Sequence, residues 1–266
     1  MRFVRIIGAV ALAVVASAFG GVALAQTGQG AQSFTLQPGG TATVTFEAFC
    51  TNFGQAFPTS IQAPNGVADA KVAGALAYIQ SNNLAADQSQ ALEAQYGIWQ
   101  AQGATGSPAG GTTAQAVAGA ATAAPASPQG TSLLDAAQSG QVRVTLSSWQ
   151  PVGNKVQIGN ASDNFYGRGT LTVENTSQQA LTLYMPVGTL FPPATAGDQT
   201  MAGYATSTQV TNPQPTPQPT AQAAQGQPQQ LPNTGDGGAG ASWLVFAGGL
   251  ALIAAGYSIR TRMRRR

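Results

Sequence analysis

The sequence contains no histidine, only one cysteine and few charged side chains. Without histidine, no catalytic triad with a histidine base can form, and the cysteine and histidine ligands of a structural zinc site are missing. No glycine-rich phosphate-binding loop is present, and the scattered acidic residues show no convergent pair of the kind that a glycosidase needs. We therefore expect a protein that is not an enzyme and that carries no metal and no cofactor.

The first residues have the pattern of a secretory signal peptide. Arg2 and Arg5 precede an apolar stretch from Ile6 to about Phe19, and the small-residue pattern Ala23-Leu24-Ala25 stands before Gln26. This order is typical of a cleaved leader rather than of a membrane span. We expect residues 1–25 to be removed and the mature protein to be secreted.

The C-terminal region combines three features in a fixed order. The motif Leu231-Pro232-Asn233-Thr234-Gly235 precedes an uncharged stretch, residues 241–259, and a cluster of arginines. As a helix, the uncharged stretch is about 28 Å long and can cross a bilayer, and the arginines would hold its end in the cytoplasm. In sequence and order these features resemble the LPxTG sorting signal of Gram-positive-type surface proteins.

The resemblance implies a location and two partners. A sortase would cleave between Thr234 and Gly235 and join Thr234 to an amine of the cell-wall peptidoglycan. The precursor would be a single-pass protein of the plasma membrane, and the mature protein would be anchored to the cell wall at the cell surface. An ordinary membrane anchor is the alternative.

Removal of both ends changes the charge of the protein. Between Gln26 and Thr234 there are four basic and eight acidic residues, a net charge of −4, although the whole sequence carries +2. The four basic residues are Lys71, Arg143, Lys155 and Arg168. Since they form no basic patch that could bind phosphates, we do not expect nucleic acid as a partner.

Composition divides the mature chain into two candidate domains and two spacers. Residues 104–130 are small, polar and interrupted by proline, which predicts a flexible linker. Residues 208–230 are rich in proline and glutamine and are typical of an extended stalk that crosses the wall. The remaining segments, 26–103 and 131–207, are each long enough for a small core. The sorting signal occupies residues 231–266.

Residue periodicity predicts a different fold for each segment. Residues 41–50 alternate as a strand, whereas Val72, Ala75, Leu76 and Ile79 follow helical spacing. A second helix is expected from Asp87 to about Gln102. Residues 142–147, 170–175 and 180–185 alternate with period two and are separated by turn residues. The expected fold is an α+β N-terminal domain followed by a small all-β sandwich or barrel, joined by disordered linkers.

Two residues do not fit simple core packing. Cys50 is an unpaired thiol in a chain expected to be secreted, where such thiols are unusual. Gln95 lies on the apolar face of its expected helix, among Leu92, Tyr96 and Trp99, where a buried amide without partners costs about 1–3 kcal/mol. One hypothesis explains both: the Cys50 sulfur has displaced ammonia from the Gln95 amide and formed an internal thioester.

The segments around these two residues resemble the thioester domains of Gram-positive surface adhesins. The similar segments are Phe49-Cys50-Thr51-Asn52 and Ala94-Gln95-Tyr96-Gly97-Ile98-Trp99, within residues 31–103. Ala94 departs from the family pattern because it is a weak hydrophobe. The resemblance implies covalent adhesion, in which an amine on a target surface attacks the thioester and becomes joined to Gln95. Tyr96, Trp99 and Phe49 would keep water from the bond, or would simply pack in the core.

Several alternatives stay open. The stabilisation needed to form the thioester could come from backbone donors or from a carboxylate such as Glu47 or Asp87. A passive structural wall protein with an inert Cys50 is the main alternative function. A pilus-like subunit with Lys–Asn isopeptide bonds is less favoured because only Lys71 and Lys155 are available.

Overall fold

The computed structural model describes residues 33–214, which form a mixed α+β fold made mostly of strands. The expected signal peptide, the part of the stalk from residue 215 and the sorting signal lie outside the described residues. The strands are β1 (Phe34–Leu36), β2 (Thr41–Cys50), β3 (Gly66–Val67), β4 (Thr131–Ser132), β5 (Val142–Pro151), β6 (Val156–Ile158), β7 (Ala161–Asp163), β8 (Tyr166–Asn175), β9 (Leu181–Tyr184), β10 (Thr189–Phe191) and β11 (Met201–Thr211). The helices are α1 (Ala70–Ser81), α2 (Gln88–Ala101), α3 (Thr112–Ala120) and α4 (Leu133–Gln138), with a short 3₁₀ turn at Leu84–Ala86.

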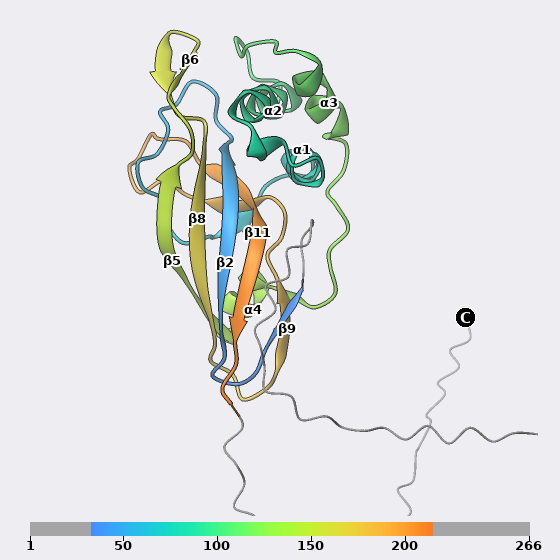
Figure 1. The fold of residues 1–266 in the computed structure, drawn as a ribbon, viewed down its shortest axis with the longest axis vertical. Helices are drawn as coiled ribbons and strands as arrows, with labels where there is room; N and C mark the ends of the chain where they lie inside the picture. Colours follow the sequence, from blue (N-terminus) through green and yellow to red (C-terminus); the bar gives the residue numbers. More distant parts are fainter. Residues whose placement is uncertain (1–32, 215–266) are drawn as a thin grey trace, which may run out of the picture. The chain divides into compact units, whose positions relative to one another are not determined.

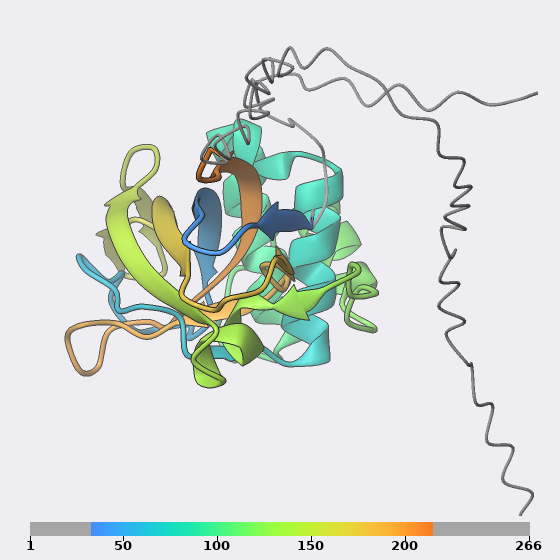
Figure 2. The ribbon, with the colours of Figure 1, turned by 90° about the horizontal axis from the view of Figure 1, so that it is seen from below.

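The largest element is a six-stranded antiparallel sheet in the order β3-β10-β11-β2-β8-β5. Its register shifts between Ala205 and Ser207 on β11 and between Leu146 and Ser148 on β5. Such bulges bend a strand and increase its twist, and the sheet is visibly curled when seen from below (Figure 2). A smaller sheet, β1-β9-β4, contains one parallel pair, β4 with β9.

The two faces of β2 belong to two apolar clusters. Val44, Phe46, Ala48 and Cys50 lie in one cluster with residues of β8, β10 and β11. Phe49 lies in the other, where α1 and α2 pack on the sheet. The three helices α1, α2 and α3 gather beside one end of the sheet (Figure 1). The alternation predicted for residues 41–50 is therefore confirmed.

The expected separation into domains 26–103 and 131–207 is wrong for the described residues. Strand β2, from the first segment, lies between β8 and β11, both from the second segment. Both neighbours pair with nearly the whole of β2. Residues Thr41 to Cys50 of β2 pair with β11, and residues Thr41 to Phe49 of β2 pair with β8. Neither segment can complete this sheet alone, so residues 33–214 fold around shared cores.

The proposed flexible linker, residues 104–130, is also corrected. It contains α3, whose Ala114 and Val117 are fully buried. Alanine has the highest helix propensity, and the small side chains let α3 lie close against α2. The stalk boundary changes as well, because β11 continues to Thr211 and pairs there with Thr41.

Candidate functional site

Cys50 is the last residue of β2 and has no solvent exposure. Its backbone N–H points towards the carbonyl of Phe165, 3.2 Å away, just before β8 begins. Its Sγ lies 3.8 Å from the Sδ of Met201, the residue opposite it on β11. The thiol is therefore enclosed in the sheet, with a thioether as its polar neighbour.

Gln95 comes from the middle of α2. The side chain of Asp87 caps this helix by accepting hydrogen bonds from the backbone N–H groups of Ser89 and Gln90. The second half of α2 is buried on several sides because the sheet, α1 and α3 all pack around it. As a result Gln95 is as fully buried as Cys50.

The structure brings Gln95 and Cys50 together. The backbone N–H of Cys50 donates to Gln95 Oε1 at 2.9 Å, and Gln95 Nε2 donates to the Cys50 carbonyl at 2.8 Å. The side-chain amide thus makes the same pair of hydrogen bonds to Cys50 that the backbone of a neighbouring strand would make. It does so at the last residue of β2, one residue beyond the point where β8 begins to pair with β2. Both polar atoms are satisfied, and the amide carbon between them is held beside the residue that carries the thiol.

Burial controls the protonation of Cys50. Removal from water raises the pKa of the thiol well above its ordinary value, and the negative charge of Asp163 raises it further. The sulfur is therefore a neutral thiol at physiological pH. Its environment resembles that of an inert buried cysteine more than that of an activated thiolate, so any reaction here depends on proximity.

The aromatic residues around the pair have different positions. Tyr96 and Trp99 share the apolar cluster of Cys50, whereas Phe49 packs on the opposite side, with its ring centroid 5.3 Å from that of Tyr166. Phe53, which the sequence analysis did not select, makes an edge contact with Trp99 at 5.0 Å. Tyr96, Trp99 and Phe53 thus belong to the apolar packing on the sulfur's side of β2.

The Trp99 indole N–H is buried and has no hydrogen-bond partner among the described residues. An unpaired buried donor costs about 1–3 kcal/mol. Trp99 follows Gln95 by one helical turn and belongs to the same apolar cluster as Cys50. A free N–H group of this kind can stabilise negative charge that develops on a nearby oxygen atom.

The structure separates the two suggested carboxylates from the site. Glu47 lies on the face of β2 opposite to Cys50, where it pairs with Arg168 and accepts from the Tyr204 hydroxyl at 3.0 Å. Asp87 is exposed and lies two helical turns before Gln95, about 12 Å along the axis. Its pKa is lowered by hydrogen bonds, first of all from the Ser89 side chain.

Asp163 is the carboxylate whose charge reaches Cys50. It ends β7, and its Oδ2 accepts from the backbone N–H of Phe57 at 2.9 Å. Sequence reasoning missed this residue because more than a hundred positions separate it from Cys50. Only the pairing of the two chain segments in one sheet places it nearby.

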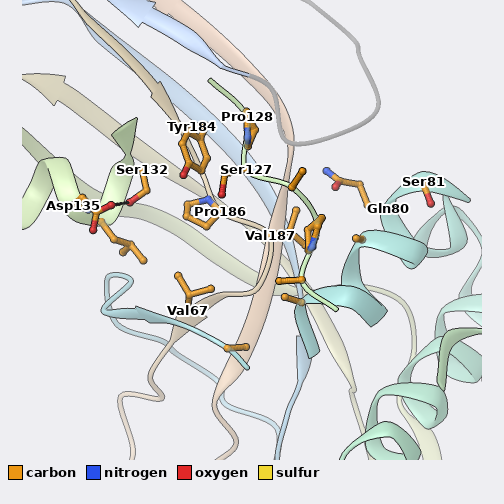
Figure 3. A pocket seen from close by; sticks show the side chains of 17 residues that line it. Val67, Gln80, Ser81, Ser127, Pro128, Ser132, Asp135, Tyr184, Pro186 and Val187 are labelled. Atoms are coloured by element: carbon orange, nitrogen blue, oxygen red, sulfur yellow. Dashed lines mark hydrogen bonds between the residues drawn. The ribbon is translucent and has the colours of Figure 1, made fainter. Parts of the chain in front are cut away.

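Away from the Cys50–Gln95 pair, a hollow lies between α1 and the β4–α4 region (Figure 3). Its volume is about 720 Å³, and small or apolar residues make up most of its lining. Tyr184, Pro186 and Val187 lie in its middle, Gln80 and Ser81 on one side, and Asp135 on the other, hydrogen-bonded to Ser132 (Figure 3). Among the described residues that line it, Asp135 is the one charged residue.

The sortase-motif residues, Leu231, Pro232, Asn233, Thr234 and Gly235, lie outside the described residues, as does the apolar stretch 241–259. Within residues 33–214, no helix has both the length and the apolar character needed to cross a membrane. Comparison of the chain with protein-family models, with curated proteins and with solved structures finds no match.

Proposed function

We propose that the protein is a cell-wall-anchored surface protein that attaches covalently to amines through a Cys50–Gln95 thioester. The anchoring part rests on the sorting-signal pattern of residues 231–266. The covalent part rests on one observation above all: the Gln95 amide is paired with the backbone of Cys50 inside the buried core.

The reaction needs no cofactor. The Cys50 Sγ attacks the Gln95 Cδ, the C–N bond breaks, and ammonia leaves with the thiol proton. A target amine then attacks the same carbon, forms an amide with Gln95 and returns the sulfur as a thiol. The protein is consumed once rather than turned over, so it acts as a covalent reagent and not as an enzyme, although the chemistry is that of nucleophilic catalysis.

Two features of the site favour this reaction. The paired hydrogen bonds fix the amide relative to Cys50. Because the two groups are already held together in the folded protein, the reaction itself does not bear much of the entropy cost of bringing them together. The buried setting also protects a thioester from water.

A passive structural wall protein is the second candidate, and one specific observation favours it. The two hydrogen bonds satisfy Gln95 without any covalent bond. Gln95 would then serve only to close the ladder at the end of β2. The two candidates differ in the mass of the protein and in the state of its thiol.

The test is the intact mass of the mature ectodomain, compared with that of Cys50→Ala. This substitution keeps the Gln95 pairing with the backbone, whereas Gln95→Ala would remove it. We expect the wild type to lack the mass of one ammonia, to show no free thiol after unfolding, and to gain one methylamine at Gln95 together with one thiol. A full sequence mass with a free thiol would refute the thioester.

Two other reactions lose the same mass and must be separated from the thioester. An N-terminal glutamine such as Gln26 cyclises with loss of ammonia, but this loss persists in Cys50→Ala. An amide between Gln95 and a lysine also loses ammonia, but it leaves the Cys50 thiol free and does not react with methylamine. Peptide mapping of the methylamine adduct assigns the site directly.

A further inference from the structure

A small hollow opens beside the buried pair. Its volume is about 270 Å³, and its lining includes Thr51 and Thr200, Asp69 and Val72 at the start of α1, and Gln102 at the end of α2. Thr51 and Thr200 are the chain neighbours of Cys50 and Met201, the two residues whose sulfur atoms are in contact. The hollow is smaller than most small-molecule pockets, so it suits an unbranched side chain better than a large ligand.

The hollow lies at the C-terminal end of α2, where Gln102 is part of its lining. Gln95, Trp99 and Gln102 follow one another at spacings of four and three residues, which places them on one stripe of the helix. Gln102 lines the hollow, and along the helix Trp99 comes between Gln102 and Gln95. The distance along the helix from Gln102 to Gln95 is about 10 Å. A lysine side chain that enters at Gln102 can span most of this distance.

Charge at the hollow comes from two residues. Asp69 caps α1 by accepting from the Val72 N–H at 2.9 Å, and its carboxylate makes no salt bridge within residues 33–214. Lys71 lines an adjoining hollow that also includes Asp69 and Gln102. The negative end of the α2 dipole is directed towards the same place. A cation entering here is attracted by Asp69 and repelled by Lys71.

We propose that this hollow is the entry for the target amine, and that Asp69 selects cationic primary amines such as lysine side chains; this rests on the proposed thioester. The ammonium group is held near Asp69 and loses its proton to solvent. The free amine then passes Trp99 and attacks the Gln95 Cδ. The C–S bond breaks, and the sulfur takes up the second amine proton as the amide forms.

The test compares two nucleophiles and two charge variants of the whole mature ectodomain. The nucleophiles are Nα-acetyl-lysine amide, which is cationic at neutral pH, and hydroxylamine, which is neutral. Asp69→Asn retains a good helix cap but removes the negative charge, and Lys71→Gln removes the positive one. Glu174→Gln is the control, because Glu174 pairs with Thr41 at the far end of β2 from Cys50. Release of the Cys50 thiol gives the rate.

We expect Asp69→Asn to slow the lysine reaction about two- to fivefold and Lys71→Gln to accelerate it by a similar factor, the size expected for one charge at a solvated site. Both effects should shrink at about 1 M salt. The hydroxylamine rate and the Glu174→Gln rates should not change. If the thioester forms but neither charge variant alters the lysine rate, the hollow is not the entry. If no thioester forms in the wild type, the proposed function itself fails.

Discussion

Gly97 of α2 lies directly against Val117 of α3. A Cβ atom added to Gly97 would come within 2.6 Å of both the Val117 Cβ and the Ala114 carbonyl oxygen. No side chain larger than hydrogen fits between the two helices here. The contact fixes a segment that composition alone suggests is a linker, and it does so two residues from Gln95.

Gly97→Ala should therefore destabilise the protein by about 1–3 kcal/mol, the usual cost of overpacking. Gly119→Ala is the matched control, because Gly119 lies in α3 with open space around it. That change should stabilise the protein by about 0.5–1 kcal/mol through helix propensity. Urea unfolding measures both, and equal effects of the two changes would contradict the packing of α3 on α2.

Proteolytic cleavage between α2 and β4 should nick the fold without dividing it. Residues 104–130 contain no lysine or arginine, so elastase, which cuts after small residues, is the suitable protease rather than trypsin. Because β2 is paired with β8 and β11, the two fragments should co-elute in size-exclusion chromatography at the volume of the intact protein. They should separate only in denaturant. Separation in native buffer would restore the two-domain interpretation.

Alkaline pH should destabilise the protein through Tyr204. Burial, followed by the charge of Glu47, raises the pKa of Tyr204 above its ordinary value of 10.0. The folded state therefore keeps a proton that the unfolded state releases above about pH 10. The stability that this protonation contributes is complete below pH 10 and is lost as the pH rises further, by up to about 1.4 kcal/mol per pH unit.

Tyr204→Phe should remove this part of the alkaline slope. At neutral pH the variant should lose about 1 kcal/mol, since the hydrogen bond to Glu47 disappears while the Glu47–Arg168 pair remains. Chemical unfolding from pH 8 to about pH 11 compares the two proteins. An identical slope in both would show that Tyr204 ionises equally in the folded and unfolded states.

Substitutions in the sorting motif test the anchor. Leu231→Ala, Pro232→Ala and Thr234→Ala should each shift the protein from the cell-wall fraction to the membrane and the medium. Asn233→Ala is the control, since this position is variable in the LPxTG pattern. Immunoblots of fractionated cells give the distribution. Wall attachment that survives the three changes would refute the sorting signal.

Local patterns in the sequence predicted individual elements well. The strand at residues 41–50 is confirmed with the same bounds, and Asp87 does cap the second helix. The four residues with helical spacing before it are all buried in α1, namely Val72, Ala75, Leu76 and Ile79. These features depend on residues near one another in the chain, and side-chain periodicity reports such local relationships directly.

The pairing of elements could not be predicted in the same way. No local pattern indicates that β2 lies between β8 and β11, because strand pairing depends on contacts far apart in the sequence. The helix α3 was missed because it has no large apolar residue beyond Val117, so it shows no amphipathic stripe. Its burial depends on Gly97, in a different helix. At the candidate site, burial of Cys50 and Gln95 was foreseen, whereas Asp163 and Phe53 appeared only with the tertiary structure.

The antiparallel pairing of β11 with β2 has a mechanical consequence. Met201 is opposite Cys50, beside Gln95, and Thr211 is opposite Thr41 at the other end of the ladder. Under the proposed function, a target joined to Gln95 would pull at the first end, and the chain that leads from Thr211 to the proposed wall anchor would pull at the second. The force then runs along the strands, so the hydrogen bonds between β11 and β2 are loaded in shear and must break together rather than one after another. Such a geometry would resist detachment under flow.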